Sequence, residues 1–198
     1  FKENLPFKLT NAQERTIKEI SEDISLAKPM RRLVQGDVGS GKTVVAAMSM
    51  YISAKNNSQS VLLCPTEVLA EQHFKNFSAW FKNLNIKIEL LTGKMPVSKR
   101  RGIYQDLENG EIDILIGTHA VFQEKVKMKN LGLVVVDEQQ RFGVKQRFDL
   151  VKKSSDQIMP HQLFMTATPI PRTLAMTIFA DLETSKIDEL PPGRKPVE

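Results

Sequence analysis

The chain has 198 residues, of which 41% are hydrophobic and 26% charged, as in an ordinary globular domain. These proportions exclude a disordered or fibrous chain, and no run of about 18 apolar residues is present that could span a membrane. Lysine and arginine total 28 against 23 acidic residues, and the net charge of +5 favours a polyanionic partner. Cys64, the single cysteine, and the missing signal sequence predict a reducing, cytoplasmic location. Because the chain begins with Phe1, we expect a processed chain or a piece of a longer one.

Short apolar runs alternate with stretches of helical periodicity along the chain. The predicted strands are Arg32–Gln35, Ser60–Cys64, Lys87–Leu91, Asp113–Gly117, Leu133–Asp137, Gln162–Thr166 and Ser185–Leu190. The predicted helices are Asn11–Ala27, Lys42–Ala54, Glu67–Leu84, Ser98–Asn109, Gly143–Ser154 and Pro171–Phe179. This alternation predicts an α/β fold with a mostly parallel central sheet and helices on both faces. Prolines end regular structure near residue 190, so we expect one domain over residues 1–190 and the start of a linker over 191–198.

The segment Gly36–Thr43 fits the phosphate-binding pattern G-x-x-x-x-G-K-[ST] completely, between a predicted strand and a predicted helix. Its glycines let backbone N–H groups turn toward an anion, and the helix N-terminus adds partial positive charge. Lys42 supplies a charge for the β and γ phosphates, and the Thr43 hydroxyl is placed to bind Mg²⁺. The alternative is a chance glycine-rich turn. The predicted nucleotide-binding residues of this loop are Gly36, Asp37, Val38, Gly39, Ser40, Gly41, Lys42 and Thr43.

A phosphate loop needs a carboxylate for its metal, and the buried strand that ends in Asp137-Glu138 supplies one. We predict that Asp137 holds Mg²⁺ and that Glu138 is the general base, which makes Glu138 and Lys42 the catalytic pair. Two acids at a strand end can simply make it soluble, but their pairing with the phosphate loop favours the catalytic interpretation. ATP and Mg²⁺ are therefore the predicted cofactors.

Three other predicted strands end in small or hydroxyl-bearing residues, at Pro65–Glu67, Gly117–His119 and Thr166–Pro169. Because the carboxyl ends of parallel strands face one crevice, we expect these groups to lie together with the phosphate loop. Thr166 and Thr168 could sense the γ-phosphate through hydrogen bonds.

Together these segments resemble the first motor domain of superfamily 2 helicases. The resemblance assigns Gly36–Thr43 to motif I, Pro65–His73 to motif Ia, Gly117–Ala120 to motif Ib, Asp137–Gln140 to motif II and Thr166–Thr168 to motif III. The segments Leu5–Gln13, Asp137–Val144, Thr166–Ala175 and Ile187–Arg194 resemble the RecG family of bacterial DNA helicases in particular. The transcription-repair coupling translocases of the Mfd type have similar motifs II and III, and they are the alternative to the RecG family.

The resemblance implies a RecA-like domain that drives double-stranded DNA translocation by ATP hydrolysis in a bacterial, cytoplasmic protein. Such helicases remodel stalled replication forks and Holliday junctions in recombination and repair. The implied partners are branched or double-stranded DNA, a wedge domain and a second RecA-like domain of the same protein, and we expect a monomer. A second hypothesis is a nucleotide-dependent DNA-binding module with little turnover, because the second domain would supply the arginine finger. A small-molecule kinase is the third, although no arginine-rich lid is apparent.

The resemblance also implies roles outside the phosphate loop. Phe7 and Gln13 match the segment that recognises adenine, since glutamine offers a donor and an acceptor and Phe7 could stack on the ring. The alternative is that Phe7 is a hydrophobic staple and Gln13 a helix-capping residue. Gln140 stands where RecG-like proteins usually have histidine, and with Thr166 and Thr168 it forms the predicted set that couples the nucleotide state to DNA movement.

The predicted DNA-binding residues are Thr66, Lys94, Gly117, Thr118 and His119. Small residues let phosphates approach backbone N–H groups, and hydroxyl groups donate to phosphate oxygens. The alternative for His119 is a surface histidine, and for the basic residues a solvated face. We expect the other two histidines to be structural and the aromatic segment around Trp80 to belong to the core.

Overall fold

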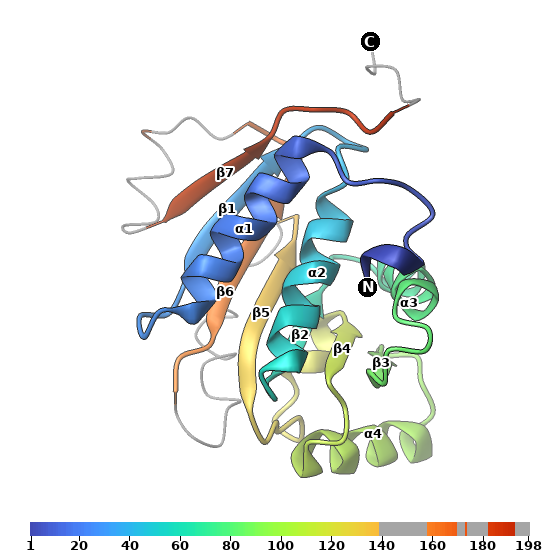
Figure 1. Cartoon of the computed structure of the whole chain (residues 1–198). Helices are drawn as coiled ribbons and strands as arrows, with labels where there is room; N and C mark the ends of the chain where they lie inside the picture. The colour runs from blue at the N-terminus through green and yellow to red at the C-terminus, as the bar shows by residue number, and fades with distance from the viewer. Residues whose placement is uncertain (139–157, 170–172, 174–181, 193–198) are drawn as a thin grey trace.

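The computed structural model describes residues 1–138, 158–169, 173 and 182–192. In these described residues, seven strands form one sheet in the order β3-β4-β2-β5-β6-β1-β7, and every pairing is parallel (Figure 1). The strands are β1 (Arg31–Gly36), β2 (Gln59–Leu63), β3 (Ile88–Leu91), β4 (Ile114–Gly117), β5 (Leu131–Asp137), β6 (His161–Thr166) and β7 (Glu183–Ile187). The helices are α1 (Asn11–Ser25), α2 (Lys42–Lys55), α3 (Glu67–Trp80) and α4 (Val97–Asn109), with short 3-10 turns at Lys2–Asn4 and His119–Phe122. No helix in this part of the chain has the length and apolar character that crossing a membrane requires.

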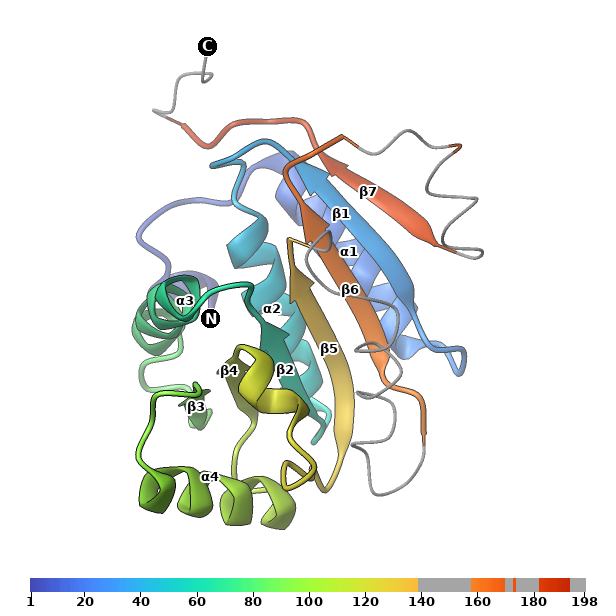
Figure 2. The same cartoon turned by 180° about the vertical axis from the view of Figure 1, so that it is seen from behind.

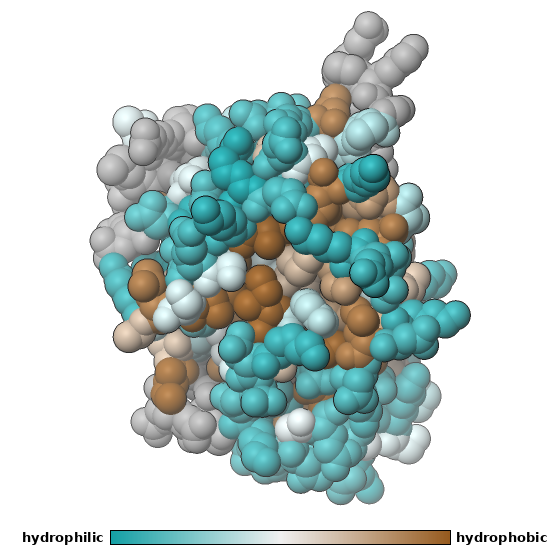
Figure 3. Space-filling model, viewed as in Figure 1, coloured by the Kyte–Doolittle hydropathy of each residue, from teal (hydrophilic) through white to brown (hydrophobic). Residues whose placement is uncertain are grey.

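Helices cover both faces of the sheet, as predicted (Figures 1 and 2). On one face α1, α2 and α3 pack through residues such as Ile20, Val45 and Phe77. On the other face α4 and the turn at His119–Phe122 bury Leu107 and their neighbours. Alternate strand residues belong to opposite cores, which explains why the strands read as continuous apolar runs. On the face that α1, α2 and α3 cover, Figure 3 shows apolar atoms between polar ones.

All seven predicted strands and four of the six predicted helices are confirmed, with different ends. The predicted helices over 143–154 and 171–179, Gln140 and residues 193–198 lie outside the described residues. The predicted end of α3 was wrong: the helix ends at Trp80, because Asn4 donates to the carbonyls of Trp80 and Lys82 at 3.0 and 2.8 Å. The prediction for β7 was also wrong at its end, because Glu189 leaves the sheet and accepts from the Ala12 amide at 3.2 Å.

Arg32 ties α1 to the edge of the sheet. It is only 8% exposed and donates to Asp23 at 2.8 Å, to Ser185 at 2.9 Å and to Glu19 at 3.5 Å. Ser185 in turn donates to Glu19. The guanidinium is therefore neutralised by partners from α1 and held against β7, as a buried charge requires.

Candidate nucleotide site

The order of the strands divides the carboxyl edge of the sheet into two halves. Neighbouring strands β5, β6 and β1 lead into Asp137, Thr166 and the phosphate loop. Their register places Asp137 beside Met165, and Thr166 beside Gln35. Strands β3, β4 and β2 form the other half and lead into the segments that carry the predicted DNA-binding residues. The two sets of predicted residues thus occupy adjoining halves of one edge.

The phosphate loop turns sharply before α2. Gly39 and Gly41 have φ of 83° and 86°, a left-handed region that glycine adopts without strain, and Gly41 is the N-cap of α2. A Cβ on Gly41 would collide with the side chain of Gln13. The Ser40 amide donates to the Asp37 carbonyl at 3.0 Å, which closes the turn. Glycine is required here by backbone angle and by space.

Lys42 lies near enough to Asp137 and Glu138 for their charges to act on its ammonium group. Its ammonium group donates to the carbonyls of Gly36 and Asp37, at 2.6 and 3.0 Å. Burial lowers the pKa of Lys42, and the carboxylates of Glu138, Asp137 and Asp37 oppose that shift without reversing it. The structure therefore brings together the lysine and the two carboxylates that the sequence predicted as partners.

Asp137 has a partner that the sequence reasoning missed. His73 Nε2 lies 2.8 Å from Asp137 Oδ2, and the two side chains are 9% and 13% exposed. The spacing of α3 could have indicated this contact. Ala70, His73 and Phe77 form the buried stripe of the helix, and a histidine is unusual on such a stripe. Burial and the nearby Asp137 also raise the pKa of the Cys64 thiol, which follows the neighbouring strand β2.

Glu138 and the two threonines complete this half of the edge. Glu138 has φ of 54°, a left-handed conformation that costs free energy in a residue other than glycine and often occurs at functional sites. Thr166 is buried, and its hydroxyl accepts from the Thr168 amide at 3.1 Å, while Thr168 itself is exposed. Because Gln140 lies outside the described residues, its predicted link to the threonines stays a prediction.

Gln13 makes the helix cap and also touches the phosphate loop. Its Oε1 accepts from the Thr10 amide at 2.9 Å, and Thr10 Oγ1 accepts from the Gln13 amide at 3.2 Å, which is a capping box. Gln13 Nε2 donates to the Ser40 carbonyl at 3.0 Å, and the residue is 1% exposed. The capping alternative is thus what the structure contains, and adenine recognition stays a prediction.

Phe7 packs edge-on against Trp80, with ring centroids 6.0 Å apart, and is 37% exposed. Trp80 in turn stacks on Phe77, so the aromatic segment of α3 belongs to a packed cluster, as expected. Phe1 joins the cluster through Phe81, at 4.9 Å between centroids. Phe7 therefore lies beside α3 and has an exposed portion.

The predicted DNA-binding residues have structural roles of their own. Thr66 is the N-cap of α3 and accepts from the Leu69 amide at 3.3 Å. Lys94 pairs with Glu67 at 2.9 Å, and this hydrogen bond raises the pKa of Lys94. Gly117 is buried, and a Cβ there would meet the Leu91 carbonyl at 2.6 Å, so glycine lets β4 lie close to β3.

Thr118 and His119 follow Gly117 into the 3-10 turn. Thr118 is 8% exposed, whereas His119 is exposed. The predicted set thus includes buried and exposed members from three neighbouring strand ends, and DNA contact by any of them stays a prediction.

The residues present suit Mg²⁺ bound together with a nucleotide. Among the described residues no group of three or more His, Cys, Asp or Glu could hold a metal ion by itself. Mg²⁺ commonly uses one or two protein oxygens and takes the rest from water and substrate phosphates. The Asp137 carboxylate and the Thr43 hydroxyl are such oxygens. In the phosphate loop, the buried Ser40 hydroxyl has no hydrogen-bond partner in the described part of the chain.

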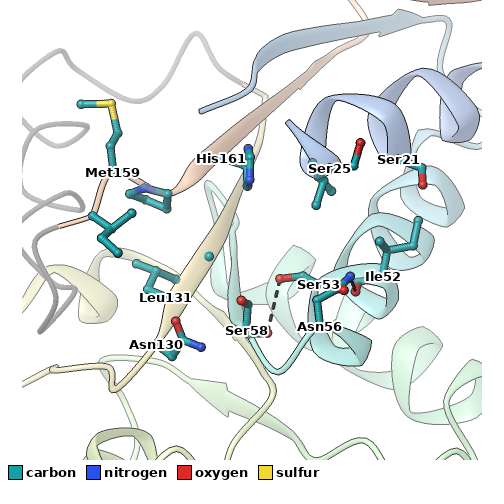
Figure 4. A pocket seen from close by; sticks show the side chains of 14 residues that line it. Ser21, Ser25, Ile52, Ser53, Asn56, Ser58, Asn130, Leu131, Met159 and His161 are labelled. Atoms are coloured by element: carbon teal, nitrogen blue, oxygen red, sulfur yellow. Dashed lines mark hydrogen bonds between the residues drawn. The ribbon is translucent and has the colours of Figure 1, made fainter. Parts of the chain in front are cut away.

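A separate cavity of about 650 Å³ opens at the opposite, amino edge of the sheet (Figure 4). It lies between the ends of α1 and α2 and the starts of β5 and β6, where Ser53 donates to the Ser58 carbonyl at 3.3 Å. His161 lines it and accepts from the Met30 amide at 2.9 Å. None of the predicted site residues that the structure describes lines this cavity.

A parallel sheet with a glycine-rich loop before α2 and an acidic pair at the end of β5 defines a P-loop domain of the RecA-like class. Residues 10–177 match the family of DEAD/DEAH box helicases, and the chain belongs to that family.

The ATP-dependent DNA helicase RecG of Escherichia coli K12 is 54% identical over 194 residues, which are 98% of this chain and 28% of that protein. RecG of Synechocystis is 53% identical over 197 residues, 100% of this chain and 23% of that protein. The similarity to RecG helicases that the motifs indicated is confirmed, and the chain spans about a quarter of the length of these relatives.

Solved structures agree with this assignment. RecG bound to a three-way DNA junction superposes with a TM-score of 0.85 at 45% identity, over 98% of this chain and 26% of that one. The DEAD-box helicase Mss116 bound to single-stranded RNA and UDP-BeF has a TM-score of 0.71 at 20% identity, over 91% of this chain and 40% of that one. The second likeness shows the fold alone.

Proposed function

We propose that this chain is the ATP-binding first motor domain of a RecG-like DNA helicase, with residues 1–190 as the domain and 191–198 as the start of a linker. In that role it works with a wedge domain and a second RecA-like domain in a monomeric protein of the bacterial cytoplasm. ATP hydrolysis drives translocation on double-stranded DNA and remodels stalled forks and Holliday junctions. The observation that supports this proposal is the phosphate loop, whose left-handed Gly39 and Gly41 lead into α2 at the same edge of the sheet where β5 ends in Asp137.

The chemistry follows from the groups at that edge. The amides of the phosphate loop bind the triphosphate, and the Lys42 ammonium exchanges the carbonyls of Gly36 and Asp37 for phosphate oxygens. Thr43 and Asp137 would hold Mg²⁺, which supplies charge neutralisation on the β and γ phosphates. Glu138 accepts a proton from the attacking water. Phe7, with its exposed portion, is the candidate to stack on the adenine ring, and Gln13 would reach adenine only by giving up a contact to Thr10 or Ser40.

The DNA track of the proposal is the half of the edge formed after β3, β4 and β2. Thr66 and His119 are exposed there, and Lys94 is a cation whose pairing with Glu67 a phosphate could replace. Similarity to a RecG that was solved on a three-way DNA junction supports a branched substrate.

The test is a steady-state ATPase assay on the full-length helicase, with linear and forked DNA compared at equal concentration. We expect forked DNA to stimulate hydrolysis more than linear DNA. Loss of the phosphate-binding charge in Lys42→Ala should lower the stimulated rate by about 10²–10³-fold. Hydrolysis that DNA does not stimulate would contradict the proposal, and phosphoryl transfer to a small acceptor would support the kinase alternative instead.

A further inference from the structure

The contact between His73 and Asp137 joins the two halves of the sheet edge. Strands β2 and β5 are neighbours, α3 follows β2, and Asp137 ends β5, so α3 can reach across to the carboxylate. The distance between His73 Nε2 and Asp137 Oδ2 is 2.8 Å, and the two side chains are 9% and 13% exposed. Against an ionised carboxylate, which only accepts hydrogen bonds, Nε2 is the donor of this contact.

The rest of the imidazole ring is held by packing. His73 Nδ1 is buried and has no hydrogen-bond partner in the described residues, and the ring lies edge-on to Phe77, with centroids 6.4 Å apart. Within the described residues, the one polar contact of the ring is that with Asp137, and it fixes one oxygen of the carboxylate.

We propose that His73 is a positioning residue that fixes the orientation of the Asp137 carboxylate for Mg²⁺ bound with ATP. This inference rests on the proposed function. Partners that hydrogen-bond to ligating carboxylates set their orientation, and removing such a partner typically lowers metal affinity or activity by about 10–100-fold. Because α3 begins at Thr66 and Glu67, beside Lys94, the same helix connects a predicted DNA contact with the metal carboxylate.

The experiment measures binding of a fluorescent ATP analogue to this chain by anisotropy, in Mg²⁺ and in EDTA. The readout is the ratio of the two affinities, which a general loss of stability does not change. We expect His73→Leu to reduce that ratio by about tenfold. His73→Gln should recover most of it, because the glutamine amide can donate from a position near that of Nε2. His161→Leu is the matched control, since it removes a hydrogen-bonded histidine from the opposite edge of the sheet and should leave the ratio unchanged.

The outcomes separate the inference from the function on which it rests. A wild-type chain whose nucleotide affinity does not respond to Mg²⁺ would overturn the proposed function and this inference with it. A normal response in the wild type and an equal response in His73→Leu would overturn this inference alone. If His73→Leu does not fold, the comparison passes to His73→Gln and His73→Asn. Asparagine is too short to reach Asp137, so equal ratios for these two variants would also overturn the inference.

Discussion

Replacing Gln13 with alanine removes two hydrogen bonds that hold the start of α1 against the phosphate loop. The Thr10 amide loses its acceptor at 2.9 Å, and the Ser40 carbonyl loses its donor at 3.0 Å. Each bond contributes about 1 kcal/mol, and a buried group left without a partner costs about 1–3 kcal/mol. Because Gln13 is 1% exposed, water cannot easily replace either contact. We therefore expect the free energy of unfolding to fall by about 3 kcal/mol.

The assay is urea unfolding of this chain, with the slope of the transition checked for two-state behaviour. Gln72→Ala is the matched control, because Gln72 is an exposed glutamine of α3 and a surface change of this kind costs within about 0.5 kcal/mol. Gln13→Glu keeps the acceptor for Thr10 and loses the donor to Ser40, so it should weaken nucleotide binding while α1 still begins at the same residue. Equal unfolding free energies for Gln13→Ala and Gln72→Ala would refute the reasoning.

Three further outcomes are expected. Arg32→Ala leaves Glu19 and Asp23 without their buried cation and should lower the unfolding free energy by about 3 kcal/mol, measured by urea denaturation; a change no larger than for an exposed arginine would contradict this. Burial lowers the pKa of His161, so the folded state binds fewer protons and stability should fall as the pH drops below 6.5. His161→Leu should flatten that dependence in unfolding midpoints taken at successive pH values. This chain alone should bind ATP yet hydrolyse it about 10³–10⁵-fold more slowly than the full-length helicase, and comparable turnover would show that no arginine finger is needed.

The sequence was informative wherever local chemistry decides the structure. The left-handed glycines of the phosphate loop and the apolar run that ends at Asp137 need only neighbouring residues to be recognised. The ends of α3 and β7 could not be predicted in this way, because Asn4 and the Ala12 amide act on them from distant parts of the chain. A contact that depends on how whole helices and strands pack cannot be predicted from neighbouring residues alone.

The same limit applies to the candidate site. The partnership of His73 with Asp137 requires β2 and β5 to be neighbours, and nothing in either segment specifies that order. Gln13 was a candidate for adenine recognition or for capping, and the structure adds a bond to Ser40 that spacing could not reveal. Lys94 was predicted from the sequence as a DNA-phosphate contact, and its pairing with Glu67 appears only in the fold.

The position of β6 between β5 and β1 determines when the nucleotide site can form during folding. The strand that precedes the phosphate loop and the strand that ends at Asp137 are never direct neighbours, and they come together only when His161–Thr166 inserts between them. During synthesis, the residues up to Thr166 must therefore have left the ribosome before ATP has a complete binding site. A ligand that binds only the completed sheet stabilises it by mass action, so cellular ATP would favour finished domains over partly folded ones.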